Sequence, residues 1–191
     1  MKKKFLTMLG IVCILIASTV PASASYSLMN KRLAGGIGNY DNDTYREYWI
    51  DSDLNTDLVT TGIDGWNHST EYSGVFSELN FKETSDRPSS IMDYYAKTLP
   101  DGTLGLTYYY RSNGSSANTN IENWAYCRVY ITTNDISDFK YITTCAHEMG
   151  HVLGFNECNT EKDSIMCQLK YSNQQYDYPI AADIEKLNAM Y

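Results

Sequence analysis

Two histidines and a glutamate stand close together in the second half of the chain: His147, Glu148 and His151. In a helix, residues four apart leave nearly the same face, because four steps turn the side chain only about 40° past a full circle. Two neutral imidazoles one turn apart can hold one zinc ion, Zn²⁺. Glu148 can reach a water on that metal without being a ligand, and zinc lowers the pKa of such a water towards neutrality. The pattern predicts a hydrolytic zinc site with Glu148 as the general base.

A catalytic zinc ion needs a third protein ligand and one open position. Gly154 follows His151 by three residues, and glycine can take the left-handed conformation that reverses a chain. Glu157, three residues further on, would then return to the metal from the opposite side. We predict Glu157 as the third ligand. The alternatives are His68, Glu161, Asp163 and a water.

An HExxH match alone can arise by chance, with histidines that only pack or cap a helix. This chain has three histidines in all. Two of them, His147 and His151, are four residues apart and enclose Glu148. Gly154 and Glu157 then follow at intervals of three residues. That combination favours the zinc site over an accidental match.

The run from residue 147 to 157, HEMGHVLGFNE, resembles the metzincin signature HExxHxxGxxH. Ser164-Ile165-Met166 resembles the Met-turn, which places a methionine beneath the metal in that clan. Within the clan the chain looks most like small bacterial matrixin-type secreted peptidases, which Gly-Gly-Ile-Gly-Asn at 35–39 and Tyr-Trp-Ile-Asp-Ser at 48–52 also suit. The resemblance covers most of the chain, but only residues 143–168 are specific.

The resemblance implies a secreted zinc endopeptidase that hydrolyses a protein or peptide substrate. The substrate would lie extended along an edge strand, either 104–111 or 124–133. The family usually has histidine, sometimes aspartate, where this chain has Glu157. Gln168 stands where some metzincins carry a tyrosine, so no tyrosine is assigned to the site. Because of Glu157, a binding protein of the same fold with a structural or degenerate zinc site and no peptidase activity is the alternative function.

Related matrixins also bind calcium. Here Asp101-Gly102 and the loop 112–120 are the places where Ca²⁺ could bind. Neither has the dense carboxylate pattern of a calcium site. A solvated turn is therefore the better interpretation, and Zn²⁺ is the one cofactor that the sequence supports.

The first 24 residues have the layout of a secretory signal peptide. Lys2, Lys3 and Lys4 precede an apolar run at 5–20, and Ala22-Ser23-Ala24 supplies small residues for cleavage after Ala24. A membrane anchor is the alternative, but the apolar run is short for a spanning helix. We predict a secreted protein with one catalytic domain, 25–191, and no stable membrane association after cleavage.

The predicted domain is acidic. Three of the 15 basic and none of the 23 acidic side chains precede residue 25, so the remainder carries a formal charge of −11. Such a charge argues against nucleic acid and anionic membranes as partners. We expect a monomer that meets only its protein or peptide substrate.

Four cysteines lie beyond the predicted signal peptide, and an even number in an exported protein suggests two disulfides. Of the three pairings, we favour Cys158 with Cys167 and Cys127 with Cys145. Zinc binding by the four thiols is the competing interpretation, but they show no CxxC pair.

The expected fold class is α+β, of the α/β type found in metzincins. It has a twisted mixed sheet of about four to five strands, an N-terminal helix, the active-site helix, and a small irregular C-terminal subdomain ending in a helix. Hydrophobic periodicity and turn residues predict strands at 46–50, 75–82, 90–96, 104–111 and 124–133, and helices at 54–68, 138–153 and 179–190. The 17 tyrosines are interpreted as amphipathic filling, because nothing in the sequence orders them into a row.

Overall fold

The central element of the computed structural model, which describes residues 26–168 and 175–191, is a five-stranded sheet. Its strands lie in the order β2 (Phe81–Glu83), β1 (Arg46–Ile50), β3 (Met92–Lys97), β5 (Tyr126–Thr132) and β4 (Gly105–Tyr110). The pairs β2–β1, β1–β3 and β3–β5 are parallel, and β4 runs antiparallel to β5. The predicted mixed sheet within an α+β fold is therefore confirmed, with β4 at one edge.

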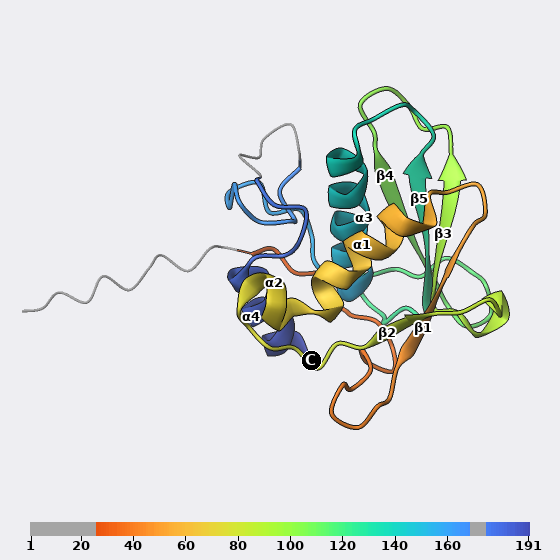
Figure 1. Cartoon of the computed structure of the whole chain (residues 1–191). Coiled ribbons are helices and arrows are strands. Elements are labelled where there is room, and N and C mark those ends of the chain that lie inside the picture. The colour runs from red at the N-terminus through yellow and green to blue at the C-terminus, as the bar shows by residue number, and fades with distance from the viewer. Residues whose placement is uncertain (1–25, 169–174) are drawn as a thin grey trace, which may run out of the picture.

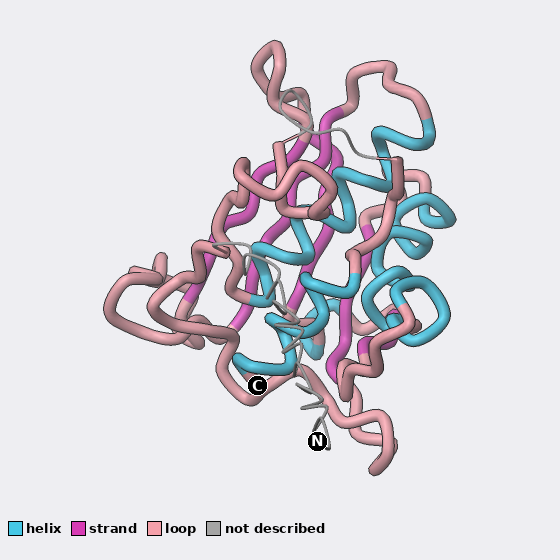
Figure 2. Tube along the Cα trace, turned by 90° about the vertical axis from the view of Figure 1, so that its left-hand side faces the viewer, coloured by secondary structure: helices cyan, strands magenta, loops and turns pink. Residues whose placement is uncertain are grey.

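The helices lie on one side of this sheet (Figure 1). They are α1 (Thr56–Asn67), α2 (Ser69–Ser73), α3 (Asp138–Leu153) and α4 (Ala181–Met190), and a short 3-10 turn, η1, covers Arg87–Ser89. From the helical side, the helices stand in front of the strands (Figure 2). None of the helices in the described part of the chain is long and apolar enough to cross a membrane.

The packing of α1 on α3 depends on a glycine. Asn55 caps α1, since its side chain accepts a hydrogen bond from the Leu58 amide. The buried face of the helix then carries Val59, Ile63 and Trp66, with Gly62 between them. A Cβ atom at Gly62 would lie 2.8 Å from the carbonyl oxygen of Ile142 and 2.9 Å from Cβ of Cys145. The absent side chain lets the two helix backbones approach closely.

Replacing Gly62 by alanine should destabilise the protein by about 1–3 kcal/mol, because the added methyl overlaps backbone atoms of α3 that cannot move aside cheaply. On an exposed helix face the same change would stabilise by about 1 kcal/mol, so the sign of the effect reports the close approach. Chemical denaturation measures it. Thr61→Ala, one residue away and exposed, should stay within about 0.5 kcal/mol of the parent.

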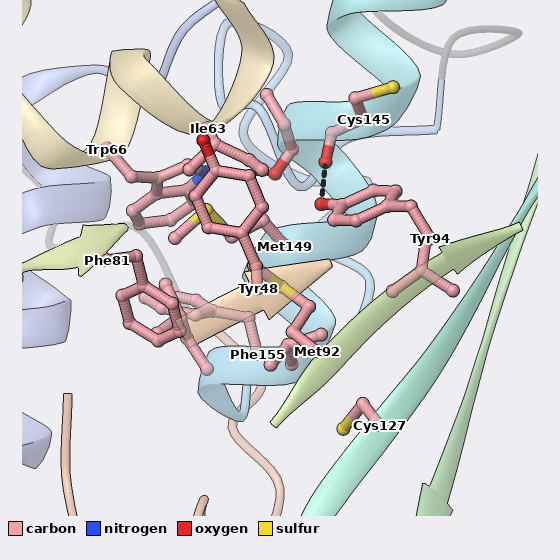
Figure 3. Packing of buried hydrophobic residues seen from close by; sticks show 14 of the residues in the cluster. Tyr48, Ile63, Trp66, Phe81, Met92, Tyr94, Cys127, Cys145, Met149 and Phe155 are labelled. Atoms are coloured by element: carbon pink, nitrogen blue, oxygen red, sulfur yellow. Dashed lines mark hydrogen bonds between the residues drawn. The ribbon is translucent and has the colours of Figure 1, made fainter. Parts of the chain in front are cut away.

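The core lies between the sheet and the helices, and aromatic side chains donate hydrogen bonds from it to carbonyl oxygens of α3. Figure 3 shows one of them, from the Tyr94 hydroxyl to the Cys145 carbonyl oxygen at 3.2 Å. In the same way, Trp66 donates to the carbonyl oxygen of Ala146 and Tyr109 to that of His151. Trp124 donates to the carbonyl oxygen of Val152 and Tyr191 to that of Leu153. Helix α3 is thus held by donors from five separate parts of the chain.

The opposite face of the sheet carries a row of aromatic rings that the sequence pattern did not reveal. Trp49 of β1, Tyr95 of β3, Tyr130 of β5 and Tyr108 of β4 follow one another with ring centroids 5.5, 5.5 and 5.6 Å apart. The guanidinium of Arg87 lies over the first two rings, and the Lys97 ammonium lies over Tyr130. Tyr95 and Tyr130 stack, the other two pairs are tilted or edge-to-face, and the cations lie over the rings. The row therefore shields a sheet face that none of the described helices covers.

Most predicted elements lie within two residues of the observed ones, with two exceptions. The strand predicted at 75–82 is only β2, because residues 75–80 are held by separate backbone bonds such as Asn80 N to Ile37 O. The sequence also did not predict α2. The final helix starts at Ala181 rather than Pro179. The predicted signal peptide lies outside the described residues, so the domain limits 25–191 stay a prediction.

Candidate metal centre

Helix α3 places His147 and His151 on one face, as their spacing predicts. Their imidazole rings lie 4.7 Å apart, nearly perpendicular to one another. The Nδ1 atom of His147 lies 2.8 Å from the Ile165 carbonyl oxygen, and that of His151 lies 2.9 Å from the Phe155 carbonyl oxygen. A carbonyl can only accept, so each Nδ1 carries the proton and each Nε2 keeps a free lone pair. Both rings are therefore in the tautomer that binds a metal through Nε2.

Glu157 reaches these imidazoles because the chain reverses at Gly154. This glycine ends α3 with φ of 109°, and its amide donates to the Gly150 and His151 carbonyl oxygens. The reversed segment is held by the N-terminal part of the chain, through bonds from Met29 N to Gly154 O and from Asn156 N to Ser27 O. The structure thus gives Gly154 the turning role that the sequence predicted.

The three predicted ligands converge. Oε1 of Glu157 lies 3.6 Å from Nε2 of His147 and 3.7 Å from Nε2 of His151. These ligand atoms all lie within 4.8 Å of one another, and they form the one group of at least three metal-binding side chains found in the described residues. Oε2 of Glu157 is buried and has no hydrogen-bond partner within residues 26–168 and 175–191. Two free imidazole nitrogens and an unpartnered carboxylate oxygen fit the donor set that zinc prefers.

The charged side chains of the group shift one another's pKa. Burial would raise the pKa of Glu157, but the neighbouring His147 and His151 outweigh it and lower that pKa to about 2. Burial would lower the pKa of His151, but Glu157 and the charge of Glu148 outweigh it and raise that pKa above 6.5. The carboxylate is therefore fully ionised at neutral pH, as a metal ligand must be.

Gln168 forms a hydrogen bond with the carboxylate of Glu157. Its side-chain amide donates to Oε1 of Glu157 at 3.2 Å. Asn159 fixes this amide, since Asn159 Nδ2 donates to the Gln168 side-chain oxygen at 3.3 Å and Asn159 Oδ1 accepts from the Gln168 backbone at 2.9 Å. Gln168 stands where some metzincins have a tyrosine. In this protein it contacts Glu157, the predicted third ligand.

The other candidate ligands lie outside the group. His68 is exposed at the C-terminal end of α1, where its Nδ1 lies 3.8 Å from an oxygen of Asp64. Glu161 and Asp163 follow Glu157 in the same loop but do not join the convergent atoms. Glu157 is thus the carboxylate that the fold brings to both histidines.

Met166 packs against α3 at Gly150, which lies between the two histidines in the sequence. Its side chain is fully buried, and a Cβ atom at Gly150 would overlap its sulfur. The turn that carries it is anchored by Asp183 of α4, whose carboxylate accepts from the Ser164 hydroxyl at 2.6 Å and from the Ile165 amide at 3.1 Å. Since Ile165 also bonds His147, Asp183 links the last helix to a predicted metal ligand.

Replacing Asp183 by asparagine should destabilise the protein by about 1–3 kcal/mol, because a side-chain amide offers one acceptor oxygen where the carboxylate offers two to buried donors. Thermal unfolding of the metal-free protein measures the loss. Asp163→Asn, an exposed neighbour of the same turn, is the matched control and should change little. Equal effects of the two substitutions would contradict the anchoring role.

Glu148 lies on α3 beside the edge strand. Its side chain is almost fully buried, and its Oε2 accepts a hydrogen bond from the Thr107 hydroxyl of β4 at 2.6 Å. The sequence did not single out Thr107, Asp183 or Asn159. A local signal existed only for Asp183, which lies in the first turn of a helix, where an acidic side chain is favoured.

The structure contradicts the predicted disulfides: Cys127, Cys145, Cys158 and Cys167 are all free thiols. Cys127 on β5 and Cys145 on α3 are well separated (Figure 3). Cys158 and Cys167 are neighbours, since the Cys158 amide donates to the Met166 carbonyl oxygen. Burial raises the pKa of the Cys127, Cys145 and Cys167 thiols, and a thiol that keeps its proton is a poor nucleophile for disulfide formation.

No protein-family model matches the chain, and no curated protein matches it. Many solved structures resemble it distantly, among them two proteins of different kinds. One is the GM1-bound form of the ECX AB5 holotoxin, with 14% identity and a TM-score of 0.49 over 81% of this chain and 86% of that chain. The other is high choriolytic enzyme 1, a hatching enzyme zinc-protease of the Medaka fish Oryzias latipes, with 13% identity and a TM-score of 0.44 over 85% and 94%. What the structure itself shows is a mixed α+β protein with a His147–His151–Glu157 group that could hold a metal ion.

Proposed function

We propose that the protein is a zinc-dependent endopeptidase of metzincin type. The observation that carries this proposal is the convergence of two Nε2 atoms of α3 and one carboxylate oxygen of Glu157, beside a helix that also bears Glu148. His147, His151 and Glu157 would hold the ion. A structural site of three ligands is incomplete, whereas a catalytic site leaves one position open.

Each residue has a separate task in the proposed reaction. Zinc in such a site supplies a Lewis acid, which polarises the scissile carbonyl and acidifies water. Glu148 takes the proton of the attacking water on a carboxylate oxygen and later returns it to the nitrogen of the leaving amine. The backbone carbonyls of Ile165 and Phe155 keep the imidazoles in the Nδ1–H form throughout. Gln168 keeps the Glu157 carboxylate directed at them.

The substrate would add a strand to β4. Of the two strands expected from the sequence, β5 is internal and is excluded, whereas β4 is an edge. The Tyr109 carbonyl oxygen accepts from Ala117, on the side away from β5. Backbone groups alternate between the two sides of a strand, so Gly105 and Thr107 present theirs to the same free edge. An extended peptide paired there would lie beside Glu148.

We also propose that residues 1–24 direct export and that the protein acts as a secreted monomer on protein or peptide substrates. The basic start, the apolar run and the small residues before position 25 support export. The rest of the chain is acidic and would repel nucleic acid and anionic membranes, so we do not propose either as a partner.

The test combines metal content with cleavage. The purified protein should bind about one zinc ion per chain and cleave members of a mixed peptide library, and chelation should stop cleavage until zinc is restored. Products identified by mass spectrometry give the bond that is cut. Zinc binding without cleavage of any peptide would contradict the endopeptidase proposal.

One observation favours the alternative, a binding protein without peptidase activity. Oε1 of Glu157 lies within 3.7 Å of Nε2 of both imidazoles, and its charge helps to raise the pKa of His151, so the group has favourable internal interactions without a metal. A protein of this kind would fold equally well without zinc and would cleave nothing. The cleavage assay, read together with the metal content, separates the two functions.

A further inference from the structure

We propose that Gly105 and Thr107 of the edge strand β4 are positioning residues that together form a seat for the Glu148 carboxylate. This inference rests on the proposed peptidase function and extends it. It assigns a task to two residues that lie in neither the metal-binding group nor the HExxH segment.

The first half of the seat is a hydrogen bond. The Thr107 hydroxyl donates to Oε2 of Glu148 at 2.6 Å, and the same hydroxyl lies 3.4 Å from the Glu148 carbonyl oxygen. A bond to an ionised carboxylate is stronger than one between neutral groups. Within the described residues no hydrogen bond is made to Oε1 of Glu148, so that oxygen remains available for a proton.

The second half of the seat is space. A Cβ atom at Gly105 would lie 2.5 Å from Oε1 of Glu148, 2.6 Å from its Cγ and 2.8 Å from its Cδ. Any side chain at this position would therefore displace the carboxylate. Gly105 and Thr107 are two residues apart on one strand, so both face α3.

Several torsions could carry a glutamate side chain away from the site, and burial alone does not choose among them. Glu148 is 4% exposed, and a buried carboxylate without a partner would be costly. The seat selects one orientation before substrate arrives. Because β4 is also the strand proposed to receive substrate, the base and the substrate backbone are placed by the same element. Such preorganisation matters, since a displacement of about 1 Å can cost about 10²-fold in rate.

The decisive variants are Thr107→Val, Thr107→Ser and Gly105→Ala. Thr107→Val keeps the shape of the side chain and removes the donor, so kcat should fall by about 10–100-fold with KM changed by no more than about twofold. Thr107→Ser restores the hydroxyl and should recover kcat to within about threefold of the parent. Gly105→Ala should lower kcat like Thr107→Val. Zinc content should stay at the parent value in all three.

The matched control is Thr98→Val, a threonine whose hydroxyl bonds Thr133 away from the site; its kcat should equal that of the parent. If Thr107→Val keeps the parent kcat, or if Thr107→Ser is as slow as Thr107→Val, the seat is refuted. These outcomes leave the proposed function standing, because the parent still cleaves peptides.

A second measurement needs no activity. In the metal-free protein, Thr107→Val should lower Tm in the parent background but much less in a Glu148→Ala background, where no carboxylate remains to be seated. Additive Tm shifts would overturn the seat. If the parent cleaves nothing, the proposed function fails, and this cycle still decides whether Thr107 holds Glu148.

Discussion

Glu148→Gln should lower kcat by about 10²–10⁴-fold, because an amide cannot take the proton of the attacking water. The change is nearly isosteric, and the amide oxygen can still accept the hydrogen bond from Thr107. Zinc content and Tm should therefore stay close to those of the parent. Steady-state cleavage of one peptide selected from the library measures the loss, beside metal analysis of the same preparation.

The control for this prediction is Glu161→Gln. Glu161 lies in the loop beyond Glu157 and is not part of the convergent group, so the substitution should leave kcat within about twofold of the parent. Full activity of Glu148→Gln would refute Glu148 as the base. Loss of zinc together with activity would instead show that Glu148 contributes to metal binding.

Glu157→Ala should weaken zinc binding by more than about 100-fold, the upper limit of losses seen when only a residue supporting a ligand is removed. Two imidazoles alone do not complete a zinc site. Glu157→His should retain zinc, because a neutral imidazole is an equally suitable donor. Competition with a chromophoric chelator gives the three dissociation constants.

Asp163→Ala is the matched control here, since Asp163 is an exposed acid of the same loop. It should bind zinc like the parent. Unchanged affinity in Glu157→Ala would exclude Glu157 as a ligand. In that case Glu161 would need the same substitution, and the affinity of Asp163→Ala would already show whether Asp163 is the ligand.

The part of the site that could be predicted depends on local rules. A four-residue spacing on a helix brings His147 and His151 together whatever surrounds them. Gly154 has a positive φ because a helix commonly ends in that way, and this local conformation reverses the chain so that Glu157 can return to the histidines. Most strands could likewise be located from β-branched and aromatic runs between turn residues.

The rest depends on pairing between distant segments. Thr107 meets Glu148 only because β4 forms the edge of the sheet next to α3, and no local pattern reveals strand order. The aromatic row on the open face arises in the same way, from registers such as Tyr95 opposite Tyr130. The predicted disulfides failed for a related reason: counting cysteines gives no distance between them.

Cysteine spacing had one partial success. Cys158 and Cys167 are neighbours in the structure, joined through the backbone bond from Cys158 to Met166. The turn that brings them together is the one that places Met166 under α3. The two thiols are free, so the predicted disulfide between Cys158 and Cys167 was wrong. The prediction was right only in placing these two segments next to each other.

The hydrogen bonds that aromatic side chains give to α3 have a consequence for how the protein folds. The donors Trp66, Tyr94, Tyr109 and Trp124 precede α3 in the sequence, and Tyr191 follows it. Contacts between such distant segments slow folding. Assembly of the metal-binding group is thereby coupled to the folding of segments on both sides of α3 in the sequence.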